Sequence, residues 1–124
     1  MSTNDQVRLV GISHSPLMEY ASEPMPIPES GPAYRAAAAE VAASMAEFDP
    51  ELVVVFGPDH FSNFYYNVMP PFCVGVRGEG EGDFDSPRGP ASVDEAAALS
   101  CLGALYEAGF DPAVSYGMRM DHGF

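Results

Sequence analysis

Two runs of apolar residues mark the first half of the chain, one at Val7–Ile12 and one at Leu52–Phe56. The second run contains five consecutive apolar residues, three of them β-branched. Such a run is typical of a strand that is buried on both faces of a parallel sheet. Gly57 and Pro58 follow it and end the strand, because proline cannot donate a hydrogen bond to a β-ladder. The pattern therefore predicts strands at 7–12 and 52–56.

Apolar positions three and four residues apart predict two helices. The apolar face of the first consists of Tyr34, Ala38, Val41, Met45 and Phe48. Ser30 or Gly31 is expected to cap this helix, with Pro32 in its first turn. The second helix is expected at 93–107, opened by a capping box at Ser92–Glu95 and closed by Gly109.

Prolines and glycines interrupt the remaining sequence. We expect short extended segments at 63–69 and 72–76, a solvated glycine-rich loop or lid at 78–89, and a last strand at 113–118. Strands that alternate with helices predict an α/β fold, with a mostly parallel or mixed sheet and helices on both faces.

The end of the sequence leads to an expectation about length. A core strand needs cover on both faces, and the chain stops directly after its last predicted strand. We therefore expect residues 1–124 to be the amino-terminal portion of a single larger α/β domain, truncated after Phe124.

A short pattern occurs twice along the chain. Phe48-Asp49-Pro50 precedes a predicted strand that ends at Asp59-His60, and Phe110-Asp111-Pro112 precedes one that ends at Asp121-His122. In both copies the histidine lies ten residues after the proline. The repetition predicts that both histidines lie at the same edge of one parallel sheet.

The chain has three histidines, and each falls just past the end of a predicted strand. They are His14, His60 and His122. Ligands of open α/β sheets bind in the crevice at the carboxyl ends of the strands. The three imidazoles are therefore predicted to share one polar site.

Three kinds of chemistry fit such a site. Two histidines and a carboxylate suit non-haem Fe(II) that activates oxygen, and three histidines suit a zinc ion that generates hydroxide. Imidazole also serves as a general acid or base near neutral pH. Asp59 and Asp121 are expected to form turns rather than orient the histidines beside them, because adjacent residues usually point apart.

Composition narrows the class of protein. A chain of 124 residues with 47% apolar residues fits a globular domain. Its net charge of −13 excludes a nucleic-acid partner and disfavours an anionic membrane surface. No apolar run is long enough to span a bilayer. Cys73 and Cys101 show no CxxC spacing, which favours a reduced, cytoplasmic protein.

Four motifs carry a resemblance to a known family. They are Ser13-His14-Ser15-Pro16-Leu17, Pro58-Asp59-His60, Tyr66-Asn67-Val68-Met69-Pro70-Pro71-Phe72-Cys73 and Met120-Asp121-His122-Gly123-Phe124. Together they closely resemble the LigB-type (class III) extradiol ring-cleavage dioxygenases, over almost the whole chain.

The resemblance implies an α/β fold that holds Fe(II) with two histidines and one glutamate. By motif, His14 and His60 match the iron ligands, and His122 matches an acid that donates a proton as the ring opens. A second catalytic histidine and the glutamate ligand are also implied, and both are expected beyond Phe124.

The reaction that the resemblance implies is extradiol cleavage of a catechol by O₂ in the catabolism of aromatic compounds. The substrate would be 3-(2,3-dihydroxyphenyl)propionate or 2,3-dihydroxycinnamate, and a homo-oligomer is expected for the full-length protein. Two alternatives stay open: a zinc-dependent hydrolase on the same fold, and a non-catalytic relative that binds a protein partner.

Overall fold

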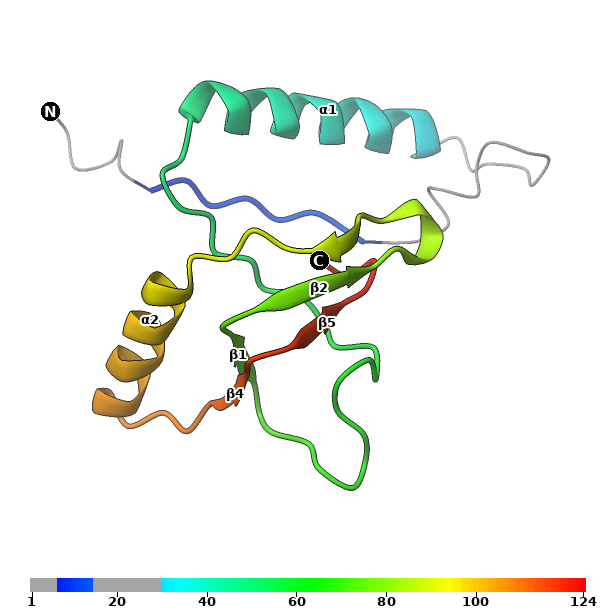
Figure 1. The fold of residues 1–124 in the computed structure, drawn as a ribbon. Helices are drawn as coiled ribbons and strands as arrows, with labels where there is room; N and C mark the ends of the chain where they lie inside the picture. The colour runs from blue at the N-terminus through cyan, green and yellow to red at the C-terminus, as the bar shows by residue number, and fades with distance from the viewer. Residues whose placement is uncertain (1–6, 15–29) are drawn as a thin grey trace, which may run out of the picture. The chain divides into compact units, whose positions relative to one another are not determined.

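The computed structural model of the protein describes residues 7–14 and 30–124 (Figure 1). The Ser15-Pro16-Leu17 part of the His14 motif lies outside the described residues. The chain divides into two compact units, Met1–Val55 and Phe56–Phe124. The site described below belongs to the second unit.

In the first unit, helix α1 spans Ser30–Phe48, as its apolar spacing predicts. The five positions of the predicted face are all partly buried, whereas most of the others are exposed. Residues 7–14 lie along this helix: Arg8 donates to the Ser44 carbonyl over 2.6 Å, and the Tyr34 hydroxyl donates to the Ser13 carbonyl. The guanidinium of Arg8 also lies over the Phe48 ring, 4.6 Å from its centre.

The two apolar runs predicted as strands are not part of any β-ladder in the described structure. Their side chains are exposed, with Leu9 at 94% and Phe56 at 92% of full accessibility. A strand exists only where a neighbouring backbone pairs with it, and the described residues supply no such partner to either run. The predicted strands at 7–12 and 52–56 are therefore not observed.

Five short strands organise the second unit (Figure 1). Strand β1 (Cys73–Gly75) pairs in parallel with β4 (Ala113–Ser115). Strand β2 (Gly78–Glu81) pairs in parallel with β5 (Met118–Met120) and antiparallel with β3 (Arg88–Pro90). The second sheet therefore has the order β3-β2-β5 and is mixed.

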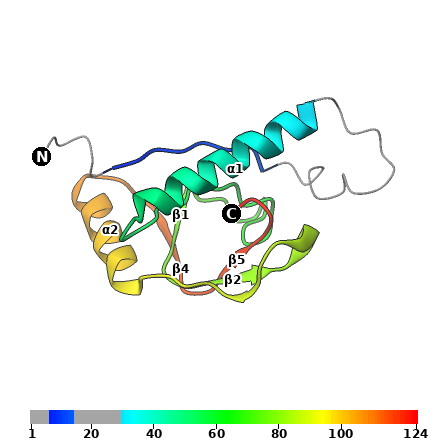
Figure 2. The ribbon, with the colours of Figure 1, turned by 90° about the horizontal axis from the view of Figure 1, so that it is seen from above.

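The two parallel pairs belong to two long chain segments that run side by side, which the view from above also shows (Figure 2). Where the strands are interrupted, Val76 donates its N–H to the Ser115 carbonyl over 2.8 Å, and Met118 donates to the Arg77 carbonyl over 2.9 Å. These bonds continue the ladder from one sheet to the next. Val76 is completely buried between them and forms the centre of the core.

The stretch at 78–89 is a β-hairpin rather than the predicted solvated loop. Strand β2 leads into a short 3₁₀ turn, η4 (Asp83–Asp85), and β3 returns beside it. A Cβ at Gly80 would collide with the Pro87 carbonyl oxygen, so only glycine permits this close pairing. The hydrogen bonds to β5 and β3 come from the backbone, and the pairing therefore leaves little trace in the sequence pattern.

Helix α2 spans Glu95–Glu107 and packs against β1 (Figures 1 and 2). Its cap is Asp94, whose carboxylate accepts from the Ala97 N–H, and not Ser92 as the capping-box pattern predicted. Its end is the predicted one: Gly109 has a φ of 84°, and Phe110 donates to the Leu105 carbonyl in a Schellman motif.

Helices combined with parallel and antiparallel strand pairs confirm the predicted α/β class with a mixed sheet. Within the described part of the chain, neither helix has the length and apolar character that crossing a membrane requires.

Candidate active site

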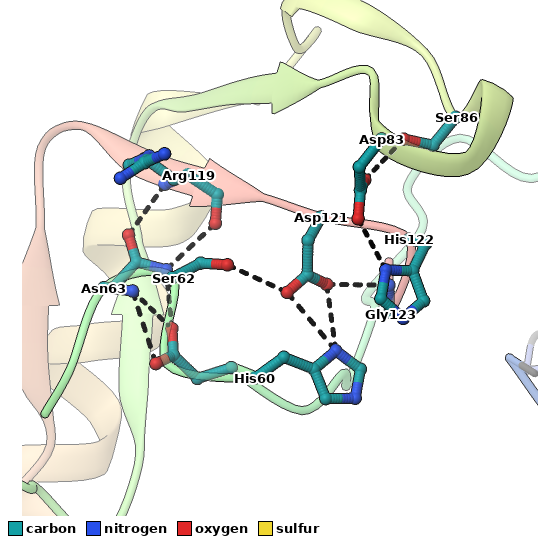
Figure 3. A network of polar contacts seen from close by, with 10 residues as sticks. His60, Ser62, Asn63, Asp83, Ser86, Arg119, Asp121, His122 and Gly123 are labelled. Carbon is teal, nitrogen blue, oxygen red and sulfur yellow. Dashed lines mark hydrogen bonds and ion pairs between the residues drawn. The ribbon is translucent and has the colours of Figure 1, made fainter. Parts of the chain in front are cut away.

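Two of the three histidines meet in the second unit (Figure 3). The rings of His60 and His122 stack with their centres 4.8 Å apart and their planes 9° from parallel. His60 follows the Gly57-Pro58 turn with a left-handed backbone, φ 42°, and His122 comes two residues after β5. A positive φ is uncommon for a histidine and is held only where the surrounding structure stabilises it. Both Asp-His pairs thus deliver an imidazole to one place. The parallel strand predicted before His60 is not observed among the described residues, however, so the two histidines do not lie at one edge of a shared parallel sheet.

The carboxylate of Asp121 fixes the ring of His60. Both of its oxygens lie 3.2 Å from His60 Nδ1, and it also accepts from the Ser62 hydroxyl over 2.9 Å and from the Gly123 N–H over 2.8 Å. Asp121 is only 4% exposed. Burial acts to raise its pKa, but the hydrogen bonds from Gly123, Ser62 and His60 outweigh burial and lower this pKa below its ordinary value. A buried anion therefore stands at Nδ1 of His60.

This contact indicates the tautomer of His60. A carboxylate only accepts hydrogen bonds, so His60 carries its proton on Nδ1 and donates a hydrogen bond from it to Asp121. The tautomer is inferred from this partner. Nε2 is then the nitrogen with a lone pair. Metal-binding histidines commonly have this arrangement, with a carboxylate behind the ring that sets the tautomer and the ring orientation.

His122 has a different carboxylate partner. Its Nδ1 donates to Asp83 over 2.6 Å, and the ring of Phe84 meets it edge-on at 4.7 Å. Asp83 in turn accepts from the Ser86 hydroxyl over 3.0 Å. Burial raises the pKa of Asp83, but the hydrogen bonds from His122 and Ser86 outweigh that effect and lower it. Each imidazole of the stacked pair therefore has its own anion at Nδ1.

A hydrogen-bond network holds the loop after His60 against β5 (Figure 3). Asp59 accepts from the backbone N–H groups of Asn63 and Phe64 over 3.1 and 2.9 Å. The Asn63 amide then bonds the backbone of Arg119 twice, donating to its carbonyl over 2.9 Å and accepting from its N–H over 2.7 Å. Asp59 is therefore a turn-forming residue, as expected.

Glycine is required beside the histidines. A Cβ at Gly123 would lie 2.9 Å from an oxygen of Asp121 and 3.1 Å from Cε1 of His60, and one at Gly57 would lie 2.7 Å from the Gly123 carbonyl. Real Cβ atoms essentially never approach another atom within 3.0 Å, as the contacts with Asp121 and with the Gly123 carbonyl would require. The two loops that carry the Asp-His pairs can approach each other only because both have glycine at this contact.

Some of the residues of this site suit a metal ion. One potential ligand atom from each of His60, Asp121 and His122 can be chosen so that all three lie within 4.8 Å of one another. The oxygens of Asp121, however, already accept from three protein donors, so this carboxylate acts behind a ligand rather than as one. The imidazole of His60, with its Nδ1 on a buried anion, is the group that fits a metal.

His14 belongs to the first unit. It is exposed, at the end of the segment at 7–14 and next to Ser13, whose carbonyl accepts from Tyr34. The role predicted for it stays a prediction from its motif.

Sequence reasoning missed Asp83 and Phe84, and it did not anticipate that Asp121 orients a histidine. Asp83 lies 39 residues before His122, within a stretch expected to be a solvated loop. The only local signal is the acidic turn Gly82-Asp83-Phe84-Asp85, and nothing in its spacing points to a histidine.

Comparison with known proteins identifies the family. Residues 8–124 match the family described as the catalytic LigB subunit of aromatic ring-opening dioxygenase. The chain therefore belongs to this family, and the resemblance seen in its histidine motifs is confirmed.

Several curated relatives have one and the same activity in their names. The chain is 42% identical, over 95% of its length, to the 2,3-dihydroxyphenylpropionate/2,3-dihydroxicinnamic acid 1,2-dioxygenase of Photorhabdus laumondii. It is 44% identical to enzymes of that name from Pseudomonas putida and Rhodococcus rhodochrous, over 91% and 93% of its length. These matches cover 35–36% of the relatives' own length, so the chain spans about a third of each.

Proposed function

We propose that the protein is an Fe(II)-dependent extradiol dioxygenase that cleaves a catechol, 3-(2,3-dihydroxyphenyl)propionate or 2,3-dihydroxycinnamate, with O₂ in the catabolism of aromatic compounds. The observation that carries the proposal is the stacked pair of His60 and His122, each with a separate carboxylate at Nδ1. Membership of the family and the names of the relatives support the choice of reaction and substrate.

The metal would be held by His14 and His60. For His60 the support is structural, because Asp121 holds Nδ1 and presents Nε2 as a ligand. For His14 the support is the sequence motif alone. When bound, Fe(II) would supply a template for the catechol oxygens and O₂ and a path for electrons between them.

His122 would donate the proton that the substrate takes up as its ring opens. Its Nδ1 is bonded to Asp83, so Nε2 is the atom through which it exchanges a proton with the substrate. Its ring stacks on that of His60, which places it beside a metal ligand without a need to bind the metal itself. This division of work makes His60 a ligand and His122 an acid.

A zinc hydrolase is the second candidate, because the imidazoles of His60 and His122 lie together and histidine is a common zinc ligand. We place the protein in the cytoplasm as part of the same proposal, supported by the free thiols of Cys73 and Cys101. A catechol and O₂ are its proposed small-molecule partners.

One experiment separates the two functions. The protein, as encoded by its gene, is purified without oxygen, loaded with Fe(II) or Zn(II), and mixed with 3-(2,3-dihydroxyphenyl)propionate in air-saturated buffer. We expect a yellow ring-fission product with iron alone, and none from 3-(3-hydroxyphenyl)propionate, which lacks one of the two hydroxyls. Ester hydrolysis with zinc, and no catechol cleavage with iron, would overturn the proposal in favour of the hydrolase.

A further inference from the structure

The hairpin turn between β2 and β3 carries a carboxylate to the second histidine (Figure 3). We propose that Asp83 is the positioning residue of His122: it holds Nδ1 and so directs Nε2 toward the reacting substrate. The inference deepens the proposed function and rests on it for the identity of the reaction. It concerns a residue outside the histidine motifs.

The hydrogen bond between His122 and Asp83 is short, and Ser86 holds the carboxylate in place. The His122 Nδ1 to Asp83 Oδ2 distance of 2.6 Å is at the short end for a hydrogen bond to a charged acceptor. The other oxygen of Asp83, Oδ1, accepts from the Ser86 hydroxyl over 3.0 Å, and the Ser86 N–H donates to the Asp83 carbonyl over 2.8 Å. The carboxylate therefore cannot turn away from His122 without losing a second bond.

The backbone of the turn is shaped for this contact. Gly82, Phe84 and Asp85 all have a positive φ, at 70°, 47° and 62°. Two of the three are not glycine, and residues with side chains hold such a conformation only where the surrounding structure stabilises it. The turn brings both the carboxylate of Asp83 and the ring of Phe84 against His122.

The three contacts restrict the ring of His122. Asp83 holds one nitrogen, the edge-on Phe84 lies 4.7 Å away at 78°, and His60 covers a face at 4.8 Å. A half-turn of the imidazole about its Cβ–Cγ bond would place a carbon at Asp83 and lose the hydrogen bond. Asp83 therefore determines both the orientation of the ring and its tautomer, as a carboxylate does behind a catalytic histidine.

The neighbouring acid offers a matched control. Asp85 lies in the same turn and also has a positive φ, and it is exposed. Asp85→Asn removes the same charge as Asp83→Asn while leaving Asp83 in place. Asp83→Asn keeps an oxygen that accepts from Nδ1, and Asp83→Ala removes it.

The test uses the whole protein with ¹⁵N-labelled histidine. In the metal-free protein, we expect the His122 signals of the parent and of Asp85→Asn to show the tautomer with its proton on Nδ1. The preference for this tautomer should be weaker in Asp83→Asn and absent in Asp83→Ala. In the iron-loaded protein, we expect kcat to fall about 10–100-fold in Asp83→Ala, less in Asp83→Asn and not in Asp85→Asn. The KM and the iron content are expected to stay unchanged.

Other results would overturn the inference. Unchanged His122 signals and kcat in Asp83→Ala would show that Asp83 does not position the ring. Equal losses of kcat in Asp83→Asn and Asp85→Asn would show that the negative charge of the turn supports turnover, and not the hydrogen bond between Asp83 and His122. If Asp83→Ala does not fold, the comparison of the two asparagine variants decides. A parent protein without catechol turnover refutes the proposed function, while the ¹⁵N signals still decide the role of Asp83.

Discussion

Asp121 precedes His122 in the chain, yet its carboxylate bonds His60, 61 positions away, with both oxygens 3.2 Å from Nδ1. Neighbouring side chains point apart, so Asp121 turns to the histidine of the other loop and leaves His122 to Asp83. The crossed pairing joins the two Asp-His loops into one site.

Replacement of the histidines should separate their roles. His122→Ala is expected to keep its iron and its affinity for catechol while kcat falls roughly 10²–10⁴-fold, the usual contribution of general acid–base catalysis. His60→Ala should lose the iron, because it removes a ligand, and His14→Ala should behave in the same way. Bound iron is measured before turnover. An iron-free His122→Ala beside an iron-loaded His60→Ala would require the two roles to be exchanged.

Removal of the charge of Asp121 should weaken both the fold and the metal site. Asp121→Asn cannot satisfy all three donors that now surround the buried carboxylate. We expect a loss of about 1–3 kcal/mol in the free energy of unfolding and about 10–100-fold weaker Fe(II) binding. Urea unfolding and Fe(II) titration measure the two effects. Asp111→Asn, at an exposed position, is the control and should change neither.

The stability of the protein should decrease in acid. Hydrogen bonds lower the pKa of Asp83 and of Asp121 in the folded state, whereas an unfolded aspartate titrates near pH 4. The unfolded chain therefore takes up protons first, so the stability that these carboxylates confer is present above about pH 4 and is lost as the pH falls below it. Urea midpoints between pH 7 and pH 3 measure this loss. Asp121→Asn should show a shallower decline, and a midpoint that is independent of pH in the parent protein would contradict the prediction.

Two glycine substitutions should act in opposite directions. Gly123→Ala would place a methyl group 2.9 Å from Asp121 and 3.1 Å from His60, so it should destabilise the protein and reduce iron binding. Gly103→Ala lies in α2 with no atom within 4 Å of the added Cβ, and should stabilise the protein by roughly 0.5–1 kcal/mol. Thermal unfolding of both variants makes the comparison. Equal and small effects would show that the contact at Gly123 is not tight.

Much of the local structure could be predicted from the sequence. The apolar face of α1 and the glycine that ends α2 depend on residues close together in the chain, so spacing alone reveals them. The repeated Phe-Asp-Pro and Asp-His pattern also predicted the meeting of His60 and His122, but by way of a parallel strand before His60 that the described structure does not contain. By contrast, the helix cap was misplaced by two residues, since Ser92 and Asp94 both carry side chains that can cap.

The sheets required tertiary structure. The apolar run at 52–56 reads as a strand but has no partner strand among the described residues, whereas the glycine-rich stretch at 78–81 reads as a loop and pairs on both sides. Strand pairing uses backbone groups that every residue carries, so the sequence pattern does not record which segments pair. Which carboxylate reaches which histidine has the same origin: the contacts join residues 39 and 61 positions apart, and only the packing of the hairpin and the two loops determines them.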